Sequence, residues 1–268
     1  WLRTYGVLEA WRSGDPQTAR ARLEEVTSTI DRESGALHEA LVGNVGRLYL
    51  LLGLLDDGRE WLRTRHADLD CSETWMLYAY AGRDREGLGR LRDGCAGLQN
   101  RLSLLAGSLL LHSGISPDQV SDLVDTRYPV PFRLAVYEAE ADLARGETER
   151  AVAKLEDALR IGAGKPSPEV RAGDPAYFLA IQSLARAYEG LGRAERSRLL
   201  LARAVEVDNT VLGSTTGALW LETLALLADL ERRHGDEAEA ERLEDRLAEL
   251  LVVADPDHPL VLEIGKRV

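Results

Sequence analysis

The chain has 268 residues, of which 45% are hydrophobic and 29% are charged, and its formal net charge is −12. This size and hydrophobic content predict a folded protein with one elongated repeat domain or two compact domains. The acidic charge disfavours direct nucleic-acid binding, because phosphate contacts need clustered Lys and Arg side chains. No apolar run approaches the roughly 20 residues of a membrane-spanning helix, so we expect no membrane insertion in this segment.

The sequence begins at Trp1, without Met and without a charged and apolar leader. We therefore expect Trp1 to be a processed or trimmed end of a longer chain.

Glycines recur at intervals of about 30 to 45 residues, near the length of a helix-turn-helix repeat, and each is flanked by apolar residues at helical spacing. These turn glycines are Gly14, Gly53, Gly82, Gly114, Gly146, Gly192 and Gly235. They predict about seven helical hairpins. No segment alternates apolar and polar residues in the way that a half-buried strand does.

Four hairpins are predicted over residues 1–128. Asp15-Pro16 and Ser116-Pro117 begin second helices, because Asp and Ser cap helices and Pro favours the first helical position. The third hairpin is the weakest match. Its second helix contains several glycines, so we expect that helix to be short or distorted. Tyr128–Pro131 then stops the fourth hairpin, because Pro disfavours helix at the preceding residue.

Three hairpins and a last short helix are predicted over residues 129–268, continuous with the first half. Gly162–Pro175 contains three prolines and three glycines, which predict an exposed connector. Asp255 to about Lys266 predicts a final helix that closes the exposed end of the array. Asp255, Asp257 and His258 also offer cation ligands, but a helix-start cluster is the favoured interpretation.

The sixth hairpin carries the strongest family signal. It reads Leu184-Ala185-Arg186-Ala187-Tyr188-Glu189-Gly190-Leu191-Gly192, followed by Ser197, Leu201, Ala204 and Asn209. Small residues stand where two helices touch and large ones where they fill the seam, and this pattern resembles the tetratricopeptide repeat. The resemblance implies an all-α, right-handed α-solenoid of about seven hairpins with a C-terminal capping helix. It also implies a concave groove that binds a protein or peptide partner.

Positions just off the buried stripe of each first helix are expected to face this groove. They are Arg47, Met76, Tyr80, Arg101, Ser108, His112, Arg133, Tyr137, Glu140, Gln182, Arg186, Glu189, Asp229 and Arg232. Tyr80, Tyr137 and Arg133 are favoured among them, because aromatic residues and Arg dominate interface hot spots. Gly43 and Asn44 stand where the family's carboxylate clamp has Lys and Asn. A receptor for chaperone tails is therefore disfavoured.

Enzymatic chemistry is not expected. Gly162–Lys165 is similar to part of a phosphate-binding loop, but Pro166 replaces the required Ser or Thr and no strand precedes it. The histidines lack the paired spacing of a zinc site. We predict no catalytic residue, no cofactor and no metal.

Cys71 and Cys95 leave two interpretations open. Helices turning near Gly82 would bring them side by side as a disulfide, while two ordinary thiols are the favoured alternative. Thiols favour the cytoplasm and a disulfide an extracytoplasmic location.

Two functions follow from these features. The first is a non-enzymatic binding scaffold for a protein or peptide, with a homodimer as another partner. The alternative is a regulatory or sensory C-terminal module of a larger bacterial signalling protein, a serine/threonine kinase or a transcriptional regulator. It rests on the ending Ala254–Pro259, which weakly resembles the close of arrays behind bacterial serine/threonine kinase domains.

Overall fold

The computed structural model of the chain describes residues 2–30, 36–65, 73–95, 104–124, 130–161, 173–207 and 212–266. These residues form 15 helices and no β-strand, which confirms the predicted all-α class. None of the described helices is both long and apolar enough to cross a membrane.

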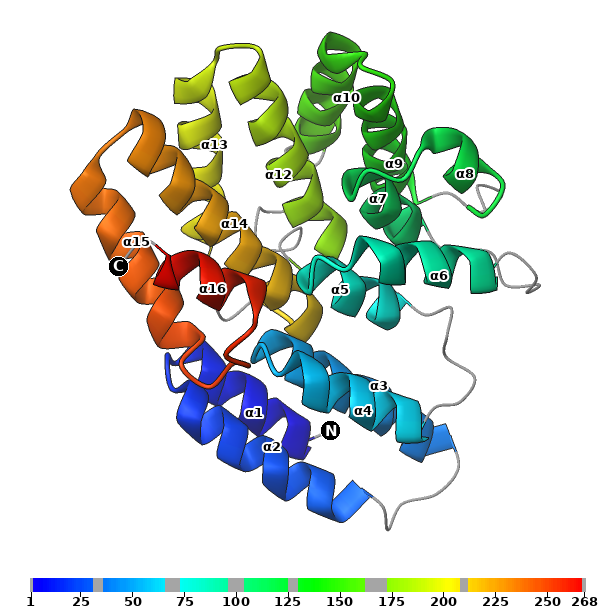
Figure 1. The fold of residues 1–268 in the computed structure, drawn as a ribbon, viewed down its shortest axis with the longest axis vertical. Helices are drawn as coiled ribbons and strands as arrows, with labels where there is room; N and C mark the ends of the chain where they lie inside the picture. Colours follow the sequence, from blue (N-terminus) through cyan, green and yellow to red (C-terminus); the bar gives the residue numbers. More distant parts are fainter. Residues whose placement is uncertain are drawn as a thin grey trace.

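The helices in the N-terminal half are α1 (Leu2–Arg12), α2 (Pro16–Ile30), α3 (Ala36–Leu51), α4 (Leu55–Arg65), α5 (Glu73–Ala81), α6 (Arg85–Cys95), α7 (Leu104–His112) and α8 (Pro117–Ser121). Those in the C-terminal half are α9 (Pro131–Ala144), α10 (Thr148–Ile161), α12 (Pro175–Gly190), α13 (Ala194–Val205), α14 (Ser214–His234), α15 (Glu237–Leu250) and α16 (Pro259–Gly265). Successive helices pack as antiparallel pairs, from α1 with α2 to α14 with α15 (Figure 1).

Most of the turns that join these pairs contain a left-handed residue. The left-handed glycines, with φ between 71° and 87°, are Gly14, Gly53, Gly114, Gly146 and Gly192. In the third turn this position belongs to Arg83, with φ of 52°, and not to the predicted Gly82. Gly235 has φ of −126° and needs no glycine on that ground. Five of the seven predicted anchors therefore carry the turn geometry.

Helix starts agree with the predicted caps at some positions. Asp15 accepts a hydrogen bond from the Thr18 amide at 2.9 Å, and α2 begins at Pro16. α8 begins at Pro117, although Ser116 makes no side-chain cap. The second helix of the third hairpin, which was expected to be short or distorted, is α6, and it is not short: it runs for 11 residues despite its glycines. The short helix is instead α8 in the fourth hairpin, with five residues. Tertiary packing has overridden the low helix propensity of α6.

The row of helix pairs folds back on itself. The first helices α3, α5, α7, α9, α12 and α14 contact one another in that order, and α14 then contacts α3 (Figure 1). At this closure the Trp11 and Trp220 rings meet edge to face, with centroids 6.1 Å apart. Arg12 Nε donates to the Leu212 carbonyl at 2.9 Å. The inner face is therefore a closed circuit of helices and not an open groove.

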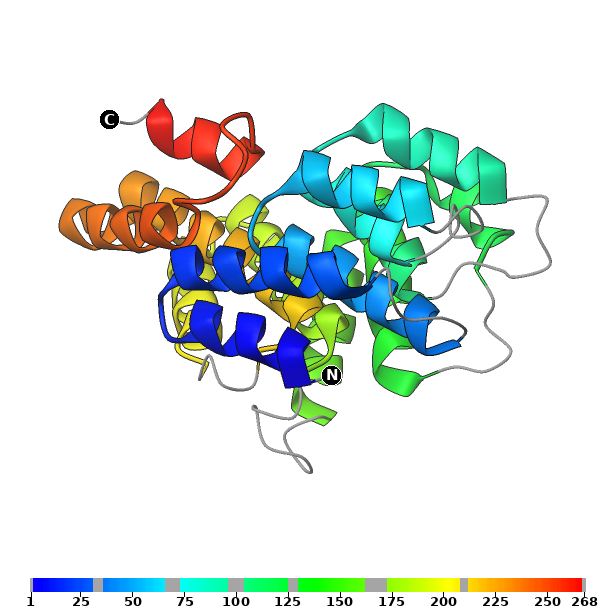
Figure 2. The same cartoon turned by 90° about the horizontal axis from the view of Figure 1, so that it is seen from below.

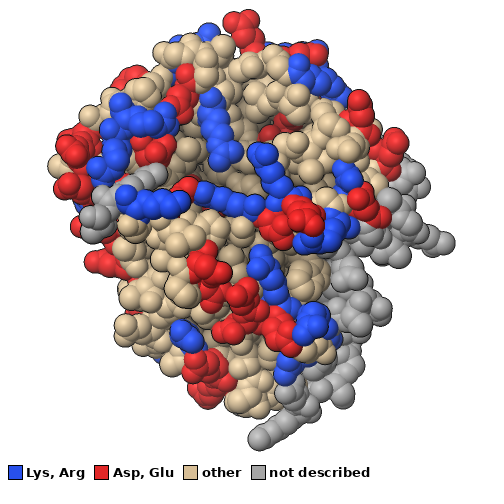
Figure 3. All heavy atoms as spheres, in the orientation of Figure 1, with Lys and Arg blue, Asp and Glu red and all other residues tan. Residues whose placement is uncertain are grey.

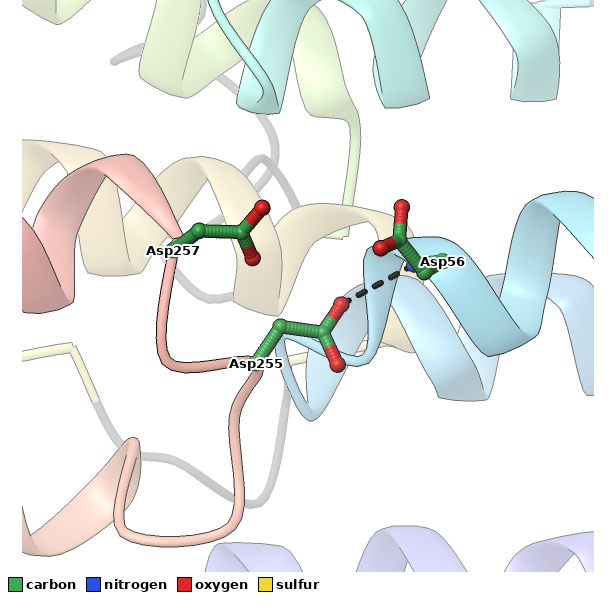
Figure 4. Close-up of side chains that lie close together, drawn as sticks. All are labelled: Asp56, Asp255 and Asp257. Atoms are coloured by element: carbon green, nitrogen blue, oxygen red, sulfur yellow. Dashed lines mark hydrogen bonds between the residues drawn. The ribbon is translucent and has the colours of Figure 1, made fainter.

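The segment before α16 fastens the closure from one side. A Cβ atom at Gly53 would lie 2.6 Å from the Ala254 Cβ, so only glycine permits this approach. Asp255 Oδ2 accepts a hydrogen bond from the Asp56 amide at 2.9 Å and so caps α4 (Figure 4). The sequence predicted that the last helix closes the exposed end of the array. In the structure, α16 instead stands above one face of the molecule (Figure 2). We call residues 251–258 the clasp.

Asp255 and Asp257 of the clasp and Asp56 of α4 bring carboxylate oxygens within 4.8 Å of one another (Figure 4). Burial, followed by the neighbouring Asp56 carboxylate, raises the pKa of Asp255. His258 is the residue that caps α16, accepting from the Leu260 amide at 3.2 Å. Two of the three predicted residues therefore cap helices: His258 caps α16, as the helix-start interpretation requires, and Asp255 caps the more distant α4.

A buried carboxylate joins α9 to α10. Asp142 accepts a hydrogen bond from Arg150 Nε at 2.9 Å and forms an ion pair with Lys154 Nζ, also at 2.9 Å. The Asp142 side chain is only 2% exposed. The hydrogen bond from Arg150 is the main cause that lowers the pKa of Asp142 to about 2. The charged form of Asp142 therefore stabilises this helix pair.

We expect Asp142→Asn to lower the free energy of unfolding at pH 7 by about 1–2 kcal/mol, because solvent around Arg150 weakens the ion pair. The contribution of Asp142 is present above pH ~4 and is lost as the pH falls toward about 2. Urea unfolding at pH 7 and at pH 3 measures both effects. Asp157→Asn, which changes an exposed carboxylate of the partner helix α10, is the control. Equal losses in the two variants would contradict the buried role.

Candidate functional site

Two adjoining cavities open on the inner helices. The first, here called the arginine pocket, has a volume of about 230 Å³ and is lined by Tyr80, Arg83, Arg85, Leu88, His112, Ser113, Arg186 and Glu222. The second, here called the aliphatic hollow, has a volume of about 390 Å³ and is lined by Leu111, His112, Glu140, Leu143, Ala144, Thr148, Ser183, Arg186, Ala187, Gly190 and Leu191. His112 and Arg186 line both, so the cavities are neighbours. Lys and Arg side chains border a hollow on this face of the molecule (Figure 3).

The floor of the arginine pocket is a saturated hydrogen-bond network. The Tyr80 hydroxyl donates to Gln182 Oε1 at 2.9 Å, and Gln182 Nε2 donates to the Leu219 carbonyl at 2.9 Å and to Thr223 Oγ1 at 3.0 Å. Burial raises the pKa of Tyr80 well above its ordinary value, so the hydroxyl stays a donor. These bonds fix α5, α12 and α14 around the pocket and satisfy its buried polar groups.

A second network holds His112 at the wall between the two cavities. His112 Nδ1 lies 2.9 Å from Ser183 Oγ and 3.1 Å from Glu140 Oε1, and Ser183 also donates to Glu140. On the opposite edge of the ring, Nε2 accepts a hydrogen bond from Arg186. This pattern assigns the proton of the neutral ring to Nδ1.

His112, Ser183 and Glu140 are the residue types of a nucleophilic triad, but their geometry differs from one. A triad places the nucleophile and the carboxylate on opposite ring nitrogens, whereas here both meet Nδ1. Ser183 is also only 1% exposed, and its hydroxyl is held by Glu140 and His112. The network positions Arg186 and is not arranged for acyl transfer.

The arginine pocket is locally cationic within an acidic protein. Among the described residues, no carboxylate forms an ion pair with Arg85 or Arg186. Arg83 pairs with Glu263 of α16 at 2.9 Å and lies 3.8 Å from Glu222. Three guanidinium groups therefore share one pocket with a single lining carboxylate, and two of them keep free donors.

Glu222 is the carboxylate of this pocket, and its side chain is 14% exposed. Burial raises the pKa of Glu222 to about 7, although the nearby Arg83 opposes that shift. The negative charge of the pocket therefore varies near neutral pH, while its three positive charges do not.

Arg83 reaches this position through a strained backbone. Its left-handed φ of 52° occupies the turn position at which five other turns have Gly. For a residue with a Cβ, this conformation costs roughly 1–2 kcal/mol. Its ion pairs with α14 and α16 offset that cost.

The structure brings several predicted residues together and separates others. Tyr80, His112 and Arg186 line the arginine pocket, and Glu140 lines the aliphatic hollow. Met76 and Gln182 lie in the interior, at 0% and 1% exposure, and do not present a partner-facing surface as predicted. Glu140 is 3% exposed and acts through His112. Ser108 is also buried, and donates to the carbonyl of Leu104.

The remaining predicted residues line neither cavity. Their contacts are ion pairs of Arg133 with Asp174, of Glu189 and Asp229 with Arg233, and of Arg232 with Glu244, and a hydrogen bond from Arg47 to Thr74. Tyr137 is half-buried in contact distance of Gly107. Arg101, Cys71, most of the Gly162–Pro175 connector and the side chain of Cys95 lie outside the described residues.

Arg83, Arg85 and Glu222 were not predicted as site residues. Arg83 had a usable signal, because aligning the turns places it where the other turns have Gly. Glu222 had no such sequence signal, because it reaches the pocket only through the packing of α14 against the other inner helices. Comparison of the chain with models of protein families, with curated proteins and with solved structures gives no match.

Proposed function

We propose that this chain is a non-enzymatic binding module of the tetratricopeptide type, a right-handed solenoid of about seven hairpins that holds a protein or peptide partner. The arginine pocket and the aliphatic hollow are its contact site. One observation carries the proposal: Arg85 and Arg186 converge on one cavity without carboxylate partners among the described residues, in a protein with a net charge of −12. Arginine and tyrosine at a concave site favour recognition of a partner group.

The closed circuit of inner helices determines what part of a partner fits. Since α14 packs on α3, an extended chain has no long groove to follow. Cavities of about 230 and 390 Å³ each hold a few side chains. The partner therefore inserts a short segment, and the networks on Gln182 and His112 keep the receiving side chains in place.

Selection of random peptides displayed against the full chain tests this function. We expect enriched peptides to bind an Arg85→Gln/Arg186→Gln variant at least about tenfold more weakly, because each variant position loses charge-assisted hydrogen bonds. An Arg193→Gln/Arg203→Gln variant is the matched control, since it removes the same charge from exposed positions on α13 and its N-terminal turn. Failure to enrich any peptide, or equal loss in both variants, would contradict the proposed site.

A further inference from the structure

The arginine pocket and the aliphatic hollow differ in chemistry but share a wall. The pocket offers guanidinium donors, and the hollow offers Leu111, Leu143 and Leu191. Because His112 and Arg186 line both cavities, one small ligand can reach both. A ligand that fills them needs an anionic head and an apolar body.

We infer that the two cavities form one binding site for a carboxylate carried on a short aliphatic group, with the carboxylate between Arg85 and Arg186 and the aliphatic group in the hollow. The inference rests on the proposed function for its location and adds the chemical class of the ligand. The carboxylate belongs either to a free aliphatic acid or to the aliphatic C-terminal residue of a peptide.

The donor inventory of the pocket favours a single carboxylate. A guanidinium has five N–H donors, and the contact of Arg186 with His112 Nε2 uses only part of its set. Arg85 lines the same pocket and contributes a second planar donor group, and planar donors match the two oxygens of a carboxylate. Glu222 in the same pocket disfavours a doubly charged phosphate, because the two negative groups repel each other.

The aliphatic hollow favours a small branched body. Its volume of about 390 Å³ lies at the lower end of small-molecule sites. Leucine side chains form much of its wall, and Ala144, Ala187 and Gly190 leave room beside them. Burial of a branched aliphatic group there removes apolar surface from water on both sides.

Protonation of Glu222 makes the affinity of this site for a carboxylate depend on pH. The charged and titratable groups that face it are Tyr80, Arg83, Arg85, His112, Arg186 and Glu222, with Glu140 behind His112 and Glu263 behind Arg83. A bound carboxylate disfavours the charged form of Glu222, so carboxylate affinity increases as the pH falls from 8 to 6. Glu222→Gln removes this dependence and leaves His112 and the arginines unchanged.

Calorimetric titration of the full chain with four probes tests the inference. N-acetyl-leucine represents a peptide end, 4-methylpentanoate represents a free acid, and N-acetyl-leucinamide and inorganic phosphate are the controls. We expect at least one carboxylate to bind about tenfold or more tightly than the amide and than phosphate. The tighter of the two carboxylates identifies the source of the ligand.

Variants locate the carboxylate. Arg186→Gln and Arg85→Gln should each weaken the bound carboxylate about tenfold, whereas Arg203→Gln should leave its affinity unchanged. Circular dichroism verifies that the variants are folded. Equal binding of acid and amide, tighter binding of phosphate, or binding of no probe would overturn the inference. Peptides that depend on Arg85 and Arg186 but tolerate an amidated C-terminus would overturn it while leaving the proposed function intact.

Discussion

Truncation of Trp220 to Ala is expected to lower the free energy of unfolding by about 3–5 kcal/mol. Trp220 is fully buried and meets Trp11 edge to face across the closure of the array. The Arg246 guanidinium carbon lies over the Trp220 ring, 4.9 Å from its centroid. The variant therefore leaves a cavity where the first and last helix pairs meet, and it also removes a cation–π contact.

Chemical unfolding measures the loss, and hydrogen exchange locates it. Exchange in α1 should increase more than exchange in α9, because α1 presents Trp11 to the closure and α9 does not reach it. Tyr5→Ala is the control, since Tyr5 is an aromatic residue of α1 that is 56% exposed, and its loss should stay within about 0.5 kcal/mol. A Trp220 variant no less stable than the Tyr5 variant would show that the closure contributes little.

The helix pairs were predictable because their signals are local. Turn glycines, Pro at first helical positions and a 3.6-residue apolar period all lie within one hairpin. The closure was not predictable, because it depends on the small rotation between successive pairs summed along the whole chain. Trp11 and Trp220 come into contact only because of this accumulated rotation, and no local pattern in either segment predicts their contact.

The same closure explains which site residues were misplaced. In an open superhelix, inward positions of the first helices face solvent, and Met76 and Gln182 were predicted there. In the closed circuit these helices face each other, so the two side chains become interior. Tyr80, His112 and Arg186, which were also predicted to face the groove, line one pocket in the structure. The pocket thus combines residues whose helix face could be predicted with Glu222, whose place in the pocket could not.

Acid is expected to loosen the clasp before it affects the helix pair of Asp142. His258 is 4% exposed, and its Nδ1 accepts the Leu260 amide as the cap of α16. Burial, followed by the charge of Arg83, lowers the pKa of His258 to about 4. In the unfolded chain this histidine has an ordinary pKa of ~6.5. Between pH ~6.5 and about 4, His258 is therefore protonated in the unfolded chain but neutral in the folded chain.

The sign of the effect follows from this difference. The contribution of His258 is fully present above pH ~6.5 and is lost as the pH falls toward about 4. Between pH 7 and pH 5 the loss should reach about 2 kcal/mol. The raised pKa of Asp255 in the same clasp acts in the opposite direction, because the folded chain then binds the proton more readily. Asp142 loses its contribution only below pH ~4, so the two windows are separate.

Urea unfolding across pH 7 to 5 measures this loss, and His258→Asn isolates it. Asn keeps an acceptor for the helix cap but does not titrate. Between pH 7 and pH 5, the free energy of unfolding of the variant should therefore fall by about 2 kcal/mol less than that of the unaltered chain. His234→Asn, at a histidine whose side chain is 44% exposed, should retain the pH dependence of the unaltered chain. If His258→Asn kept the full dependence, another group would be responsible.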